Sequence, residues 1–144
     1  MDWQECKWQK FVKEINVDES LINSLIKSSE NKLKTNKRVE LDETTASTKV
    51  SIVYESLREV LEALAVKKGF KIYNHECFCS FLNEICKDKT ASAKFDNFRK
   101  IRNQINYYGK DIDTEEATIM IKDMILLRKD ILNKYWDLKV SRRW

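Results

Sequence analysis

The chain contains no proline and only two glycines among its 144 residues. Tight turns and strand ends depend on these two residue types, so a chain that nearly lacks them has few of the turn-forming residues that a β fold requires. Leu, Ile, Lys and Glu are abundant, which favours helices. The sequence therefore predicts an all-α fold, an up-and-down bundle of five to six helices forming a single domain over residues 1–144.

Apolar residues recur every three or four positions along several segments, the spacing of a buried helix face. We expect an N-terminal helix within residues 1–17, a second helix capped by Asp18, and a long third helix that starts near Asp42 and stops before Gly69. A shorter helix is expected over residues 74–87.

A helix running up to Gly109 and a last helix complete the predicted bundle. The last helix begins after Asp113, with Glu116 three residues later as in a capping box, and residues 139–144 are expected to fray. The core is predicted to contain seven apolar residues of the three long segments: Leu57, Leu61, Leu64, Phe98, Ile105, Leu127 and Ile131.

The charge and cysteine content place few limits on function. The 27 basic and 23 acidic side chains give a net charge of +4 and are spread along the whole chain, which neither indicates nor excludes a polyanionic partner. The sequence shows no signal peptide and no membrane span. We therefore expect a cytoplasmic protein without a membrane partner, whose four cysteines are reduced thiols and not two disulfides.

His75 and the nearby cysteines are the residues to consider first for metal or covalent chemistry. Cys77 and Cys79 are two positions apart, so on a helix their sulfurs point to opposite sides, and a zinc site would need a further ligand. His75 and Cys79 lie one turn apart, but no Gly-rich oxyanion loop accompanies them. We expect the cysteines to pack as small hydrophobic residues, with no metal and no cofactor.

Arg102 is the residue that most suggests a function. The predicted helix carries an apolar stripe into which this arginine projects, formed by Phe95, Phe98, Ile101, Ile105 and Tyr108. A buried, unpaired charge costs several kcal/mol in practice, so the guanidinium needs an anionic or strongly polar partner. A carboxylate of Glu59, Glu62 or Asp123 and a ligand phosphate are the alternatives, and Arg99 and Asn106 lie on the same edge.

The stretch Arg102-Asn103-Gln104-Ile105-Asn106-Tyr107-Tyr108-Gly109 also resembles a known family. A long helix ending in Lys67-Lys68-Gly69, a short helix opening with Asn74-His75-Glu76, the Arg102 helix and a long last helix together resemble the HEPN domain, the higher eukaryote and prokaryote nucleotide-binding domain. The resemblance covers about residues 18–138. It is carried most by Arg102-Asn103 and otherwise by the order of the helices.

The resemblance implies a helical homodimer in which two arginine motifs meet in one cleft. Catalytic HEPN proteins are metal-independent ribonucleases with an Arg-polar-x3-His motif, and many act in toxin-antitoxin or defence pairs beside a small nucleotidyltransferase. Arg102 and Asn103 match the first two positions, but Tyr107 stands where the motif has histidine. A phenol is a poor substitute for an imidazole in proton transfer near neutral pH.

We therefore expect a HEPN-like protein that binds nucleotide or RNA, or docks a nucleotidyltransferase partner. The predicted binding residues are Arg102, Asn103, Asn106, Tyr107 and Arg99. One alternative is an active endoribonuclease in which Asn103, Tyr107 or His75 replaces the missing histidine. The other is a plain helical interaction module, in which Arg102 forms a structural ion pair.

Overall fold

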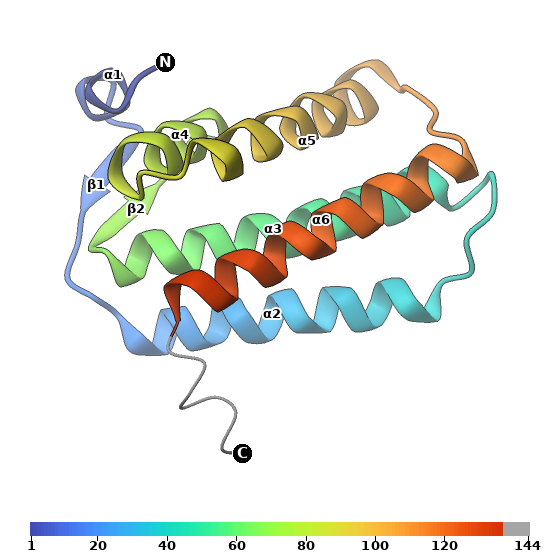
Figure 1. The fold of residues 1–144 in the computed structure, drawn as a ribbon, viewed down its shortest axis with the longest axis horizontal. Helices are drawn as coiled ribbons and strands as arrows, with labels where there is room; N and C mark the ends of the chain where they lie inside the picture. Colours follow the sequence, from blue (N-terminus) through green and yellow to red (C-terminus); the bar gives the residue numbers. More distant parts are fainter. Residues whose placement is uncertain (137–144) are drawn as a thin grey trace.

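The computed structural model describes residues 1–136, so the tail predicted to fray, residues 139–144, lies outside the described residues. The described chain folds as a helical bundle with one small β-ribbon (Figure 1). Its helices are α1 (Trp3–Trp8), α2 (Glu19–Arg38), α3 (Ala46–Lys67), α4 (His75–Ser80), α5 (Lys89–Tyr108) and α6 (Thr114–Tyr135). The ribbon joins β1 (Val12–Glu14) to β2 (Phe70–Ile72), and a π-helical turn, η1 (Phe81–Ile85), continues α4.

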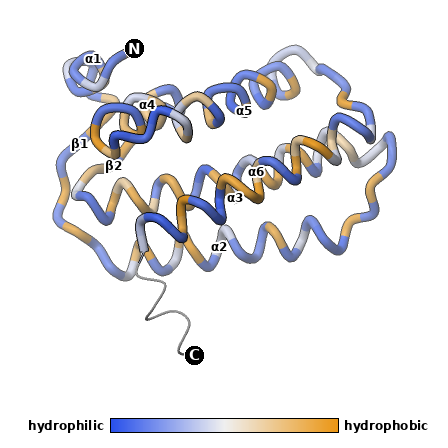
Figure 2. Tube along the Cα trace, viewed as in Figure 1, coloured by the Kyte–Doolittle hydropathy of each residue, from blue (hydrophilic) through white to orange (hydrophobic). Residues whose placement is uncertain are grey.

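Helix α3 forms the centre of the bundle and packs against α2, α5, α6 and β2. Hydrophobic residues recur along α3 and α6, whereas hydrophilic residues dominate much of α2 (Figure 2). Five predicted core residues are buried: Leu57, Leu61, Leu64, Leu127 and Ile131. Phe98 and Ile105 pack against the core but are only half-buried, and Tyr108 is exposed.

The helix ends follow the capping residues that the sequence predicts. Asp18 accepts a hydrogen bond from the backbone N–H of Leu21, and Asp113 accepts one from that of Glu116. Gly109 ends α5 in the left-handed conformation, with φ of 63°. These side chains satisfy backbone groups that have no partner within their own helix. At α3 the N-cap is Thr45 and not the predicted Asp42, so the helix begins at Ala46, three residues later than predicted.

The N-terminal segment differs from the prediction of one helix within residues 1–17. Helix α1 ends at Trp8, Lys10 turns the chain with φ of 63°, and residues 12–14 form a strand instead. Strand β1 pairs antiparallel with β2, so that Val12 lies opposite Ile72, and both side chains are buried. Gly69 allows this pairing because it has φ of +89°, and its missing Cβ would lie 3.3 Å from the carbonyl oxygen of Ile15.

The segment predicted as one helix over residues 74–87 forms α4 followed by the π-turn η1. Cys86 donates its backbone N–H to the carbonyl of Phe81 at 3.0 Å, which closes the wider turn. Phe78 packs edge-on against Phe95, with ring centroids 6.1 Å apart. This contact holds α4 against α5, and it brings the start of α4 beside the second half of α5.

Candidate functional site

The start of α4 and one face of α5 border an open polar pocket of about 430 Å³. Four lining residues come from α5 and four from the link after β2 and the first turn of α4: Arg99, Arg102, Asn103 and Tyr107, with Tyr73, Asn74, His75 and Glu76. We call this site the Arg102 pocket. It contains four of the five binding residues that the sequence predicts, because their spacing places them on adjoining turns of α5.

Arg102 is the central basic residue of the pocket, and its side chain is 19% exposed. Its Nη2 lies 3.3 Å from a carboxylate oxygen of Glu55 on α3, and its guanidinium lies over the ring of Tyr54, 5.5 Å from the centroid. The predicted need for a polar partner is met by Glu55. Glu59 instead pairs with Lys32, and Glu62 pairs with Arg58 and Lys71.

The hydrogen bonds of Arg102 are long compared with those of a neighbouring arginine. Besides the 3.3 Å bond to Glu55, Arg102 donates within the described residues to Asn103 alone, at 3.5 Å. Arg58 on α3 donates to Glu55 at 2.8 Å and to Glu62 at 2.6 Å. A guanidinium has five N–H donors, so much of the donor capacity of Arg102 is not used by close contacts with residues 1–136.

His75 enters the pocket from α4, and its Nδ1 lies 3.0 Å from the hydroxyl of Tyr54. Burial lowers the pKa of His75 to about 4, and the positive charges of Arg58 and Arg102 act in the same direction. Burial raises the pKa of Tyr54. At neutral pH the pocket therefore presents an uncharged imidazole next to Arg102, bonded to an uncharged phenol.

Arg99 and Asn106 differ in their relation to the pocket. Arg99 lines it while its Nη2 donates to Asp96 at 2.7 Å, so its charge is already paired within α5. The predicted binding residue Asn106 is exposed and does not line the pocket.

In the half of the pocket that precedes and begins α4, the sequence predicts only His75 as a site residue, as one alternative to the missing motif histidine. It does not predict Tyr73, Asn74 or Glu76 as pocket residues. Periodicity assigns residues to the faces of one helix and does not show which helices meet. The only signal available was that the one histidine of the chain lies beside a helix cap, at Asn74.

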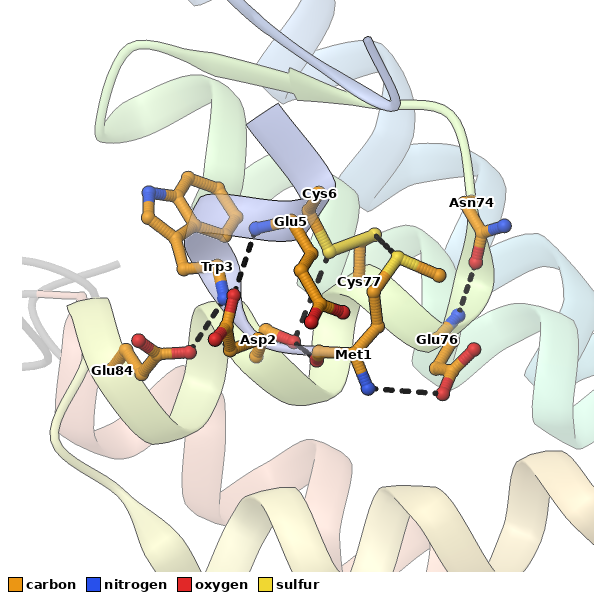
Figure 3. Close-up of a disulfide and its surroundings, with 10 residues drawn as sticks. Met1, Asp2, Trp3, Glu5, Cys6, Asn74, Glu76, Cys77 and Glu84 are labelled. Carbon is orange, nitrogen blue, oxygen red and sulfur yellow. Dashed lines mark hydrogen bonds and ion pairs between the residues drawn. A yellow bond between two sulfur atoms is a disulfide. The ribbon is translucent and has the colours of Figure 1, made fainter. Parts of the chain in front are cut away.

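The cysteines differ from the expectation of four reduced thiols. Cys6 of α1 and Cys77 of α4 form a buried disulfide with Cα atoms 6.0 Å apart, which ties the N-terminal segment to the helix that carries His75 (Figure 3). Cys79 and Cys86 are free. Burial raises the pKa of Cys79 to about 12 and that of Cys86 to about 11, so neither is an activated thiolate at neutral pH.

The sulfurs of Cys77 and Cys79 point to opposite sides of α4, as expected. Their partners also show that Cys79 and His75 do not form a nucleophile pair. The sulfur of Cys77 bonds to Cys6, whereas that of Cys79 donates to Asp96 at 3.6 Å and not to His75. Among residues 1–136, no three His, Cys, Asp or Glu side chains gather as a metal site. In the same range no helix has the length and apolar character needed to cross a bilayer.

Comparisons of the chain with protein-family models, with characterised proteins and with solved structures give no match.

Proposed function

We propose that this chain is a HEPN-like helical protein that binds the phosphate of a nucleotide or of RNA in the Arg102 pocket. The observation that carries the proposal is the weak pairing of Arg102, whose hydrogen bonds within residues 1–136 are two long ones, to Glu55 and Asn103, at the wall of an open pocket. A phosphate offers several acceptor oxygens that match the fork of a guanidinium, and such charge-assisted bonds are the strong ones.

The other lining residues support an anionic ligand with polar groups. Two lining residues, Arg99 and Arg102, are basic, and one, Glu76, is acidic. The amides of Asn74 and Asn103 each carry an N–H donor as well as a carbonyl oxygen. The oxygen of Asn74 already accepts from the backbone of Glu76, so its NH₂ group is the part left for a ligand.

Binding of a labelled single-stranded RNA, followed by fluorescence anisotropy at fixed salt, tests this proposal. Losing a hydrogen bond to a charged group costs about 1.5–3 kcal/mol, so Arg102→Ala is expected to weaken binding about 10- to 150-fold. Arg102→Lys keeps the positive charge and loses the planar guanidinium, so its affinity for RNA should lie between those of the wild type and Arg102→Ala. Arg38→Ala removes the same charge from the exposed end of α2 and serves as the matched control.

Equal losses for Arg102→Ala and Arg38→Ala would contradict the proposal, because they would indicate binding to overall positive charge. A thermal melt of each variant shows whether it is folded, since Arg102 also pairs with Glu55. Unchanged RNA binding by a folded Arg102→Ala variant would support the structural ion pair instead.

The position of His75 favours a second candidate function, slow metal-independent RNA cleavage. A neutral imidazole beside Arg102 can take the proton of a ribose 2′-hydroxyl. The 2′-oxygen then attacks the adjacent phosphorus, the 5′-oxygen leaves with a proton from water, and a 2′,3′-cyclic phosphate remains. A group with a pKa as low as about 4 is a weak base, so we expect a slow reaction.

Cleavage assays in the presence of a chelator test this second function. His75→Gln should remove the cleavage and leave RNA binding in place, whereas Tyr107→His should increase it by placing a second imidazole on the pocket wall. Cleavage that survives His75→Gln would overturn the role of His75. Fast cleavage by the unmodified chain would overturn the expectation of low activity.

The homodimer and the nucleotidyltransferase partner remain predictions from the HEPN resemblance. Tyr107 and Tyr108 at the end of α5 are 71% and 83% exposed, which is compatible with a second surface packing beside the pocket. A stable interface should bury at least about 1,000 Å² in total. Light scattering that reports the mass of one chain at micromolar concentration would contradict the dimer.

A further inference from the structure

Two exposed aromatic side chains border the Arg102 pocket. Tyr73 is 60% exposed and Tyr107 is 71% exposed, and both line the pocket. Tyr73 comes from the link before α4, and Tyr107 comes from the end of α5. Within the described residues neither ring packs against another aromatic ring. Their apolar faces are therefore open to a ligand that enters the pocket.

The backbones that carry these tyrosines are held in place by regular structure. Tyr73 directly follows β2, and its N–H donates to the carbonyl of Phe11 at 2.8 Å. The next residue, Asn74, caps α4. Tyr107 lies in the last turn of α5, which Gly109 ends. Both rings are thus presented by positioned backbone, which limits the ordering cost when a ligand packs against them.

The spacing along α5 places Tyr107 beyond the basic centre of the pocket. It is five residues after Arg102, and at 1.5 Å per residue this is about 7.5 Å along the helix axis. In a nucleotide the phosphate and the base are separated by a ribose. A base that extends along α5 from a phosphate at Arg102 can therefore reach Tyr107, which lines the same pocket as Tyr73.

We infer that Tyr73 and Tyr107 bind the base of an unpaired nucleotide by stacking, so that the ligand is a mononucleotide or a single-stranded nucleic acid and not a duplex. This inference rests on the proposed function, in which Arg102 binds the phosphate. Aromatic side chains stack on any base, because every base has a π face, whereas bases inside a duplex already cover both faces with their neighbours. The volume of about 430 Å³ lies within the range of small-ligand sites, about 300–1,000 Å³.

Binding of AMP and of ribose 5-phosphate, measured by calorimetry, tests the inference. The two ligands share the phosphate and the sugar and differ in the base. Stacking contributes about 1–3 kcal/mol per base, so AMP should bind about 5- to 150-fold more tightly than ribose 5-phosphate. Tyr73→Ala and Tyr107→Ala should weaken AMP binding and leave ribose 5-phosphate binding unchanged, whereas Tyr73→Phe and Tyr107→Phe should preserve both.

Tyr108→Ala is the matched control. Tyr108 is adjacent to Tyr107 and is more exposed, at 83%, but it does not line the pocket, so its loss should change neither affinity. Equal binding of AMP and ribose 5-phosphate, both lost in Arg102→Ala, would overturn stacking and leave the proposed phosphate site intact. If Arg102→Ala binds both AMP and ribose 5-phosphate as tightly as the wild type, the proposed function is overturned.

A comparison of nucleic acids separates the two sources of an unpaired nucleotide. A single-stranded oligonucleotide that binds more tightly than AMP supports a nucleic-acid ligand, and equal binding supports a free nucleotide. In either case a duplex of the same sequence should bind more weakly than the single strand at the same salt concentration. Equal binding of duplex and single strand would contradict the inference, because stacking on the tyrosines needs an open base.

Discussion

Acidification should destabilise this protein in part through His75, the one histidine of the chain. Burial and the charges of Arg58 and Arg102 lower its pKa from 6.5 to about 4 in the folded chain. Between these two values the unfolded state binds a proton that the folded state does not. Stability is therefore fully present above pH 6.5, and it falls as the pH decreases toward 4.

The size of the effect follows from the two pKa values. At pH 5 a shift from 6.5 to about 4 lowers the free energy of unfolding by about 2 kcal/mol, compared with about 0.2 kcal/mol at pH 7. Urea unfolding at the two pH values measures this loss. Carboxylates titrate in the same range, so the relevant quantity is the difference between the wild type and His75→Gln, in which their contribution cancels.

This difference in unfolding free energy should decrease by about 2 kcal/mol from pH 7 to pH 5. The chain contains one histidine, so NMR of the imidazole reports its titration without overlap. A midpoint between 6 and 7 for the imidazole, or wild type and His75→Gln losing stability in parallel, would refute the reasoning. The pocket would then not hold His75 neutral by burial beside two arginines.

Three further changes test the fold. Cys6→Ser opens a disulfide that spans 71 residues and should lower stability by about 4 kcal/mol in urea unfolding without reductant, and reduction of the wild type should have the same effect. Leu61→Ala in the core should cost about 2–5 kcal/mol, whereas Ile119→Ala on the exposed face of α6 should change stability by less than about 0.5 kcal/mol in thermal melts. Gly109→Ala should cost about 1 kcal/mol because Gly109 has φ of +63°. No loss in Cys6→Ser would contradict the disulfide, no loss in Leu61→Ala the core position of Leu61, and no loss in Gly109→Ala the left-handed conformation of Gly109.

The sequence predicts most of the fold because local signals specify helices well. Asp18, Asp113 and Gly109 act at the helix ends where they were expected, since capping depends on a few neighbouring residues. The β-ribbon was not predicted. Strand β1 is three residues long and gains its stability by pairing with β2, which lies more than fifty residues away in the sequence.

A buried polar cluster between α2, α3 and α6 is also formed by residues far apart in the sequence, and it was not predicted either. Ser29 donates to the carbonyl of Ser56 at 2.7 Å, and Arg128 donates its Nε–H to Ser29 at 2.8 Å. Burial lowers the pKa of Arg128. In the sequence these residues are ordinary polar positions, and only the packing of three helices shows that they meet.

The candidate site was predicted mainly on its α5 side, with His75 of α4 named as one alternative to the missing motif histidine. The sequence predicts Arg102 as a site residue because a charge on an apolar stripe needs a partner. It predicts Arg99, Asn103 and Tyr107 because helical spacing places them near Arg102. Arg102 pairs with Glu55 because of the way α3 packs against α5. His75 lies in the same pocket because of the way α4 packs against α5. A periodic pattern within one helix does not contain that information.

The most direct test of the central claim is the NMR signal of the His75 ring during a titration with AMP. A phosphate bound at Arg102 offsets one of the positive charges that lower the pKa of His75, so the account predicts a saturable shift of this signal and a higher imidazole pKa in the complex. The shift should be absent in Arg102→Ala and present in Arg38→Ala. A His75 signal that does not respond to saturating AMP, or that responds equally in Arg102→Ala, would contradict a phosphate site in the Arg102 pocket.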